Sequence, residues 1–184
     1  MLDQLISQNI NLIQSESLTK LMIVATTIGD KYTIAIFSLI VLLLLIFRKK
    51  DFPRTRLFTL TMAAGVILSQ ALKRIIQRAR PENMLIAKDG FSFPSGHSTL
   101  AVCFFGMMIY LFRNEIKNKT LRYSFITINI LMIISIALSR IYLNVHWLTD
   151  VIAGLTLGLI CILASIWACK KIPFLNKYQL FIIN

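Results

Sequence analysis

The sequence predicts an all-α integral membrane protein, a helical bundle of about five transmembrane helices preceded by an N-terminal amphipathic helix. Composition, hydropathy and the distribution of apolar residues carry this prediction. Hydrophobic residues make up 57% of the 184 residues and charged residues only 15%, whereas a soluble domain has roughly 45–50% apolar and about 25% charged residues. The mean hydropathy is +0.72. The apolar residues also form long runs, which argues against a soluble enzyme, a disordered chain or a collagen-like repeat.

The first 20 residues differ from the rest of the chain. Apolar residues recur there at helical spacing between Gln, Asn and Ser residues, at Leu2, Leu5, Ile6, Ile10 and Ile13. This pattern indicates an amphipathic helix in the membrane interface, and it lacks the basic start and continuous apolar core of a signal peptide. We therefore divide the chain into an interfacial helix, residues 1–20, and a transmembrane domain, residues 21–184.

Five apolar runs in that domain are candidate spans. They are Tyr32–Phe47, Leu57–Leu72, Ser98–Phe112, Tyr123–Ser139 and Trp147–Cys169. Several are shorter than the roughly 20 residues that a spanning helix needs, so we expect them to extend into their flanks. Small residues inside the runs suit close helix contacts in lipid. The runs lack the wide polar face that a helix in a water-soluble bundle would need.

The basic residues predict the orientation. The chain has 20 Lys and Arg residues against 8 Asp and Glu, a net charge of +12. Most of them fall in inner connections if the N-terminus lies outside and the C-terminus inside the membrane. The outer minority clusters between Lys73 and Lys88, on the face that also receives both histidines. Since the basic residues are split between the two faces, we expect no nucleic-acid partner.

The first polar group on the outer face runs KRIIQRARP from Lys73 to Pro81. If the second span continues as a helix up to the proline, Lys73 and Arg80 lie about two turns apart on one face, with Gln77 between them. Two cations on a rigid element form a clamp for a phosphate group. The other explanation for these basic residues is that their side chains extend to the lipid headgroups at the membrane surface.

The second polar group runs PSGHS from Pro94 to Ser98 and opens the third span. A helix that begins after Ser95 and Gly96 presents free backbone N–H groups, which bind anions. Gly96 allows the backbone to approach such an anion closely. His97 then lies beside the anion and can donate a proton to a departing oxygen. The alternative is a simple helix cap formed by Ser95.

The third polar group runs SRIYLNVHWLTD from Ser139 to Asp150. His146 and Asp150 are four residues apart at the start of the fifth span, so a helix would stack them on one face. Asp150 can then accept a hydrogen bond from one ring nitrogen of His146 and leave the other free as a nucleophile. The alternative is an ordinary His–Asp pair on a helix surface, although an unpartnered carboxylate in an apolar run is costly.

Together the groups supply what phosphoryl transfer needs, namely positive charge for the phosphate oxygens, a nucleophile and an acid for the leaving group. The charge comes from Lys73, Arg80 and Arg140, the nucleophile from His146 with Asp150, and the acid from His97. Two histidines and one aspartate on different helices, without an HExxH motif or Cys ligands, do not form a typical zinc site. We expect neither a metal nor a cofactor.

These groups resemble the signature of the type 2 phosphatidic acid phosphatase (PAP2) family, which reads KxxxxxxRP, PSGH and SRxxxxxHxxxD. The matching segments are Lys73–Pro81, Pro94–His97 and Ser139–Asp150, in family order, within a resemblance that covers about Gly29 to Trp167. The resemblance implies a metal-independent phosphatase. His146 would attack phosphorus and become a phosphohistidine, supported by Asp150, and His97 would protonate the leaving oxygen. The residues implied to hold the phosphate are Lys73, Arg80, Ser95, Gly96 and Arg140.

The resemblance also implies a function and a location. The expected activity is hydrolysis of a lipid phosphate, of the phosphatidylglycerophosphate, phosphatidic acid or lipid A type, at the outer face of a bacterial cytoplasmic membrane. Undecaprenyl diphosphate phosphatase and lipid-to-lipid phosphotransferase remain alternatives, as does a non-catalytic membrane protein that binds lipid headgroups. The expected partners are the lipid substrate and membrane lipids, without an obligatory protein partner. Bacterial membrane members typically have six spans, whereas this sequence predicts five.

Overall fold

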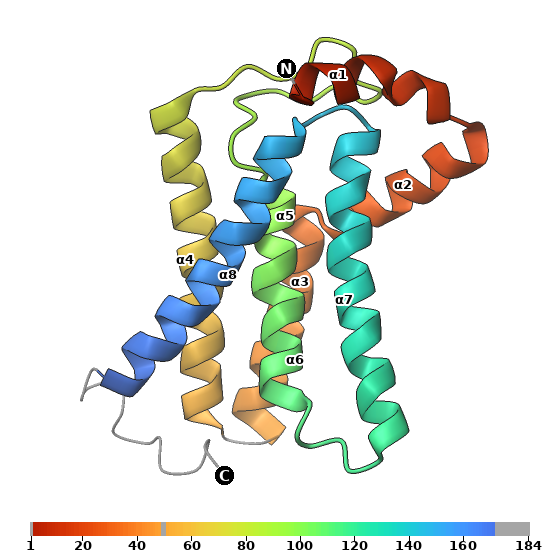
Figure 1. Cartoon of the computed structure of the whole chain (residues 1–184). Coiled ribbons are helices and arrows are strands. Elements are labelled where there is room, and N and C mark those ends of the chain that lie inside the picture. The colour runs from red at the N-terminus through yellow and green to blue at the C-terminus, as the bar shows by residue number, and fades with distance from the viewer. Residues whose placement is uncertain (1, 49–50, 172–184) are drawn as a thin grey trace.

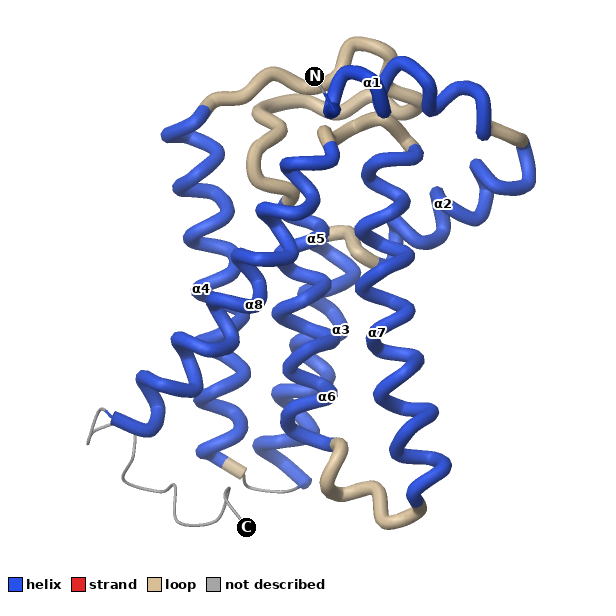
Figure 2. Tube along the Cα trace, viewed as in Figure 1, coloured by secondary structure: helices blue, strands red, loops and turns tan. Residues whose placement is uncertain are grey.

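The structure is a computed structural model that describes residues 2–48 and 51–171. Within these residues all regular secondary structure is helical and no strand is formed. Long helices lie side by side, the first N-terminal helix lies across one end of the bundle and the second descends along its side (Figures 1 and 2). The predicted all-α membrane bundle is therefore confirmed. Residues 172–184 of the predicted transmembrane domain lie outside the described residues.

The N-terminal segment forms two helices rather than one. Helix α1 (Leu2–Asn9) continues as a 3-10 turn (Ile10–Ile13), and α2 (Glu16–Ile28) begins after Ser15, whose side chain accepts a hydrogen bond from the Leu18 N–H. Residue 20 thus lies inside α2, and the predicted boundary after it does not coincide with a helix end. Helix α1 lies across the end of the bundle (Figure 1). Its position in the membrane interface stays a prediction.

The five apolar runs all become helices. They form α3 (Lys31–Leu43) with a π-helical turn (Leu44–Arg48), α4 (Phe52–Ile76), the central α5 (Gly96–Ala101), π-turn (Val102–Gly106) and α6 (Met107–Phe112), α7 (Lys119–Tyr142), and α8 (Leu148–Lys171). Among the described helices, α4, α7 and α8 are each long and apolar enough to cross a membrane. Helices α2 and α3, bent by 48°, form a fourth candidate span, and the central segment Gly96–Phe112 is shorter.

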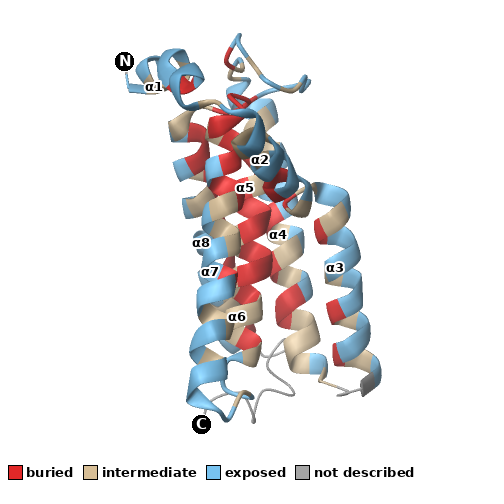
Figure 3. Cartoon of the chain, turned by 90° about the vertical axis from the view of Figure 1, so that its right-hand side faces the viewer, coloured by how far each residue is buried: buried red, intermediate tan, exposed pale blue. Residues whose placement is uncertain are grey.

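The short central segment is the core of the bundle (Figure 3). Ala101, Cys103 and Met107 are fully buried there, and α3, α4, α7 and α8 pack around this segment. The surrounding helices point large apolar side chains outward, for example Ile67 and Leu163, which are more than half exposed. A surface of this kind is suited to lipid rather than water.

Two glycines bring α8 against the central segment. A Cβ atom at Gly154 would lie 2.5 Å from the carbonyl oxygen of Ser95, and one at Gly158 would lie 2.6 Å from the Val102 Cβ. The close approach lets the Ser95 N–H donate a hydrogen bond to the Asp150 carbonyl at 2.9 Å. It places the second and third polar groups at the same end of the bundle, where α4 also ends (Figure 1).

Candidate active site

The three polar groups line one cavity of about 530 Å³ at this end of the bundle. Six of the eight predicted site residues line it: Lys73, Arg80, Gly96, His97, Arg140 and His146. The other two, Ser95 and Asp150, are fully buried behind its wall. Residues that are far apart in the sequence therefore form a single cationic pocket that contains both histidines.

The first group does not form one helical face. Helix α4 ends at Ile76, and Gln77 follows in the left-handed region with φ 51°, its N–H donating to the Lys73 carbonyl. The prediction that this helix continues to Pro81 is therefore wrong, because a left-handed residue ends a helix. The two cations still meet, since Lys73 Nζ and Arg80 Nη2 both donate to the Phe91 carbonyl, at 2.9 and 3.3 Å.

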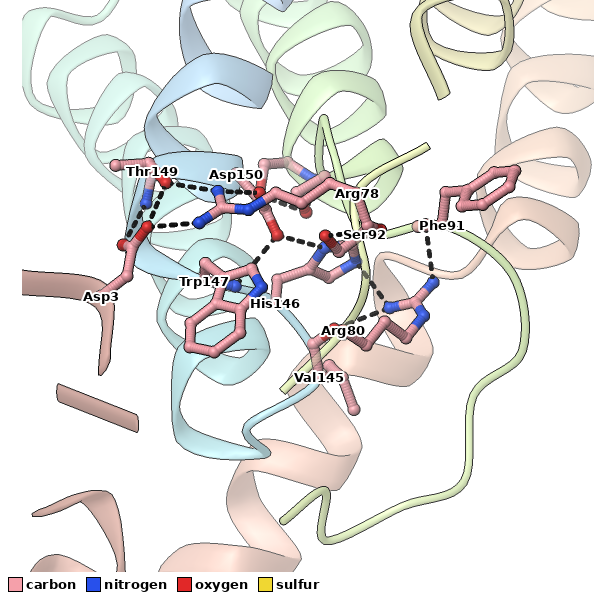
Figure 4. Close-up of polar contacts among 12 residues, drawn as sticks. Asp3, Arg78, Arg80, Phe91, Ser92, Val145, His146, Trp147, Thr149 and Asp150 are labelled. Atoms are coloured by element: carbon pink, nitrogen blue, oxygen red, sulfur yellow. Dashed lines mark hydrogen bonds and ion pairs between the residues drawn. The ribbon is translucent and has the colours of Figure 1, made fainter. Parts of the chain in front are cut away.

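Arg80 also defines the protonation of His146. Its Nη1 donates to the Val145 carbonyl at 2.6 Å and lies 3.3 Å from His146 Nε2 (Figure 4). A guanidinium has only donors, so Nε2 is the acceptor and the ring proton is on Nδ1. Burial lowers the pKa of His146 to about 4, with Asp150 opposing this shift and the cations of the pocket adding to it. At neutral pH the imidazole is uncharged and has its lone pair on Nε2, as a nucleophile requires.

Asp150 lies next to His146 through a helix cap rather than through helical stacking. Helix α8 begins at Leu148, so His146 precedes it. Asp150 Oδ2 accepts a hydrogen bond from the Trp147 N–H at 3.0 Å and lies 3.5 Å from His146 Nδ1. Within the described residues Nδ1 is buried without a hydrogen-bond partner. Such contacts in substrate-free enzymes often tighten when substrate binds.

His97 has a carboxylate neighbour that its helical spacing does not reveal. Asp30 Oδ2 lies 3.8 Å from His97 Nε2, and Asp30 Oδ1 caps α3 by accepting from the Tyr32 N–H. The break between α2 and α3 packs tightly on α7, because a Cβ at Gly29 would lie 2.5 Å from the Ile136 side chain. This contact places Asp30 at the cavity, where its negative charge partly offsets the cations.

Arg140 is buried and incompletely hydrogen-bonded. Its Nη1 donates to the hydroxyl of Thr26 in α2, a second partner that the sequence does not reveal. Its Nε is buried and has no hydrogen-bond partner among the described residues. A buried donor without a partner costs about 1–3 kcal/mol. Since Arg140 lines the cavity, an anion bound there would supply the missing acceptor.

Ser95 and Gly96 contribute in different ways. The Ser95 hydroxyl accepts hydrogen bonds from the Ser98 N–H at 3.4 Å and from the Ser98 hydroxyl at 2.9 Å, so it caps α5 instead of lining the cavity. A Cβ at Gly96 would meet only the Lys73 Cε, at 4.0 Å. Packing within the protein therefore leaves space at Gly96, and this space belongs to the cavity.

The chemistry of the cavity suits an anion better than a metal ion. Lys73, Arg80 and Arg140 all line it. Across the described ranges, no three His, Cys, Asp or Glu side chains are grouped so that they could hold a metal ion. Phosphate oxygens match guanidinium and ammonium donors well.

Comparison with known proteins points in the same direction. The PAP2 superfamily model matches residues 54–173. Phosphatidylglycerophosphatase B of Bacillus subtilis is 34% identical over 107 residues, which are 56% of this chain and 52% of that protein. Lipid A 1-phosphatase of Rhizobium etli is 34% identical over 113 residues, 55% of this chain and 44% of that protein. The chain thus spans about half the length of these curated relatives.

A solved structure extends the similarity to nearly the whole chain. The crystal structure of a transmembrane PAP2-type phosphatidylglycerolphosphate phosphatase from Bacillus subtilis superposes with a TM-score of 0.83 at 28% identity. The superposition covers 92% of this chain and 85% of that one. It therefore includes part of the N-terminal region, which supplies Thr26 and Asp30 and precedes the segment matched by the family model.

Proposed function

The chain is a member of the PAP2 superfamily, and we propose that it hydrolyses the phosphate of a membrane lipid such as phosphatidylglycerophosphate. The observation that carries the proposal is an apolar groove joined to the cationic cavity. The groove, of about 600 Å³, lies between α3 and α4. Lys31, Val66 and Leu100 line both the groove and the cavity. A lipid phosphate has an anionic head and apolar tails, so the cavity fits the head and the groove fits a tail.

In the first step, His146 Nε2 attacks phosphorus and forms a phosphohistidine. Lys73, Arg80 and Arg140 stabilise the negative charge on the phosphate oxygens in the transition state. In the substrate-free protein the Arg80 guanidinium donates to Nε2 of an uncharged imidazole. A negatively charged phosphate oxygen is a stronger acceptor, so it takes over this hydrogen bond and leaves the lone pair on Nε2 free to attack. Asp150 stabilises the cationic ring that forms when Nε2 bonds to phosphorus.

His97 acts as the acid for the leaving group. The departing lipid alkoxide takes its proton, and in the second step the neutral His97 accepts a proton from the water that attacks the phosphohistidine. This returns His146 and His97 to their starting states and releases inorganic phosphate. Burial, together with nearby cations such as Arg140 and Lys73, lowers the pKa of His97 to about 2 in the substrate-free protein, so its protonation needs negative charge nearby. Asp30 and the bound phosphate supply that charge.

The substrate proposal follows from the relatives. The curated relative and the solved structure from Bacillus subtilis are both named for phosphatidylglycerophosphate, and the relative from Rhizobium etli is named for lipid A. We place phosphatidylglycerophosphate first, followed by phosphatidic acid and lipid A phosphates. If the substrate were undecaprenyl diphosphate, a second phosphate would lie in the same cavity. In a lipid-to-lipid phosphotransferase, a lipid hydroxyl would take the place of water in the second step.

The proposed location is the bacterial cytoplasmic membrane with the cavity facing outward. The excess of Lys and Arg in the predicted inner connections supports this orientation. A reporter fused after Lys88 should give an external signal, and one fused after Lys119 a cytoplasmic signal. A cytoplasmic signal after Lys88 would contradict the orientation.

The test is phosphate release by the full chain, purified in detergent, from phosphatidylglycerophosphate, phosphatidic acid, undecaprenyl diphosphate and a lipid A phosphate. We expect turnover that EDTA leaves intact, since side chains supply both the charge and the nucleophile. Orthovanadate should inhibit it by mimicking five-coordinate phosphorus. Lipid binding without any phosphate release would indicate a non-catalytic headgroup-binding protein. Activity that EDTA removes and Mg²⁺ or Zn²⁺ restores would overturn the mechanism.

A further inference from the structure

Arg78 connects the proposed catalytic carboxylate to the first helix of the chain. Its Nη1 donates to Asp150 Oδ1 at 2.7 Å and to the Thr149 hydroxyl at 2.6 Å, and its Nη2 donates to Asp3 Oδ2 at 2.7 Å (Figure 4). Arg78 is not a signature position and does not line the catalytic cavity. Its role must therefore act through Asp150 rather than through the substrate.

Asp150 needs such a partner because it is fully buried. An ionised carboxylate in that position is costly unless it is paired and hydrogen-bonded. Its two oxygens have different neighbours, since Oδ1 contacts Arg78 while Oδ2 accepts from the Trp147 N–H and faces His146. Arg78 thus pairs with the buried carboxylate and fixes the direction in which Oδ2 points.

Arg78 is itself held from several sides. Asp3 accepts hydrogen bonds from the Thr149 N–H and hydroxyl as well as from Arg78. Burial raises the pKa of Asp3, but these hydrogen bonds outweigh it and the pKa lies below its ordinary value. The guanidinium carbon lies 5.3 Å from the centre of the Trp147 ring, whose Nε1 donates to the Ala79 carbonyl.

We propose that Arg78 is a positioning residue for the nucleophile and that it orients Asp150 toward His146. Asp3, at the start of α1, fixes the Arg78 guanidinium in place. The inference rests on the proposed function, in which Asp150 supports His146. An oriented carboxylate keeps the proton on Nδ1 and the ring in place, so that Nε2 is directed at phosphorus. The N-terminal helix is then part of the catalytic assembly.

The kinetic test uses Arg78→Ala, Arg78→Lys and Asp3→Asn in the full chain in detergent, with Arg113→Ala at the opposite end of the bundle as the matched control. Arg78→Ala should lower kcat by about 10- to 100-fold, as is typical when the partner of a reacting side chain is removed. KM should stay within about threefold, because Arg78 does not touch the substrate. Arg78→Lys should retain part of the lost activity, Asp3→Asn should lose less, and Arg113→Ala should match wild type.

Chemical rescue separates positioning from a merely structural role. A shallow cavity of about 330 Å³, lined by Asp3, Gln4, Arg78, Ala79 and Trp147, gives solvent access to the guanidinium. Millimolar guanidinium chloride should restore part of the kcat of Arg78→Ala and none of that of Asp150→Ala. The inference would be overturned if the kcat of Arg78→Ala were within about twofold of wild type. It would also be overturned if added guanidinium restored no activity to Arg78→Ala and Arg78→Lys were as slow as Arg78→Ala.

Two further outcomes keep the inference separate from the proposed function. If Arg78→Ala does not fold, wild-type kcat in both Arg78→Lys and Asp3→Asn would contradict it. A wild-type chain that releases no phosphate from any lipid would refute the proposed function itself. An active wild type together with full activity in the Arg78 variants would refute the positioning role alone.

Discussion

The segment matched by the family model and the segment before it contribute to the cavity in different ways. Residues 54–173 contain every proposed reactive and phosphate-binding group. The described residues 2–48 contain none of these, yet three of their side chains contact residues of the site or a partner of those residues. Asp3 contacts Arg78, Thr26 contacts Arg140, and Asp30 lies beside His97.

The comparison shows that reactive groups and their orienting partners can come from different parts of one chain. In the proposed mechanism the signature motifs specify the chemistry, because each motif holds groups assigned to bind the phosphate, attack it or protonate the leaving group. The N-terminal helices supply second contacts to these groups or to their partners. Substitutions in the motifs should therefore cost orders of magnitude in activity, and substitutions in the N-terminal region about a tenfold factor.

The largest effect should come from His146→Ala. The variant lacks the nucleophile, so hydrolysis of phosphatidylglycerophosphate and of an aryl phosphate should both fall by about 10⁴-fold or more. Phosphate release is the measurement, with size-exclusion elution showing that the variant is folded. If the variant kept a substantial part of the activity on either substrate, His146 would not be the nucleophile, and the motifs would not supply the reactive group.

His97→Ala should come second and should depend on the leaving group. A lipid alkoxide needs a proton as it departs, so we expect a loss of about 10²–10⁴-fold on a lipid phosphate. A nitrophenolate leaves readily without one, so the loss on p-nitrophenyl phosphate should be much smaller. Equal losses on the two substrates would show that His97 is not the acid.

Asp30→Asn tests whether the N-terminal region acts through the motifs. Removal of the negative charge beside His97 should slow hydrolysis of a lipid phosphate by about 10-fold. In the His97→Ala background the same substitution should have little further effect, because the two residues form one unit. Asp51→Asn is the matched control, since Asp51 also caps a helix but does not line the cavity. Additive losses in the double variant would mean that Asp30 works independently of His97.

Thr26→Val should have the smallest effect. It removes a hydroxyl that accepts from Arg140 and keeps the volume of the side chain, so phosphate binding should weaken by about 1 kcal/mol. We expect KM to rise by about fivefold with little change in kcat. Thr27→Val is the control, because the Thr27 hydroxyl donates to the Ile23 carbonyl within the same helix. Unchanged KM in Thr26→Val would limit the N-terminal contribution to Asp3 and Asp30.

The sequence predicted the elements and the gathering of the motifs well, because both follow from local patterns. Apolar runs of this length form helices, and successive helices that run up and down the bundle bring the three polar groups to one end of it. The end of α4 was predicted four residues too late. Pro81 was the visible stop signal, whereas Gln77 ends the helix in a left-handed conformation that its residue type does not announce.

The partners from the N-terminal region could not be predicted from spacing. Asp3 and Arg78 are separated by 75 positions, and Thr26 and Arg140 by 114. Their contacts depend on how α1 packs over the end of the bundle and α2 against α7, which periodicity does not specify. The proximity of His146 and Asp150 was predicted from their spacing, but it arises from a cap at the start of α8 rather than from two positions inside a helix.

The most direct test of the account is to trap the phosphoenzyme. Wild-type chain mixed with ³²P-labelled phosphatidylglycerophosphate and quenched rapidly in alkali should contain acid-labile phosphate on His146, found by mass spectrometry of the peptide that carries Asn144–Asp150. His97→Ala should form the same adduct more slowly, and His146→Ala should form none. Phosphate on His97, or rapid turnover without any phosphohistidine, would contradict the account.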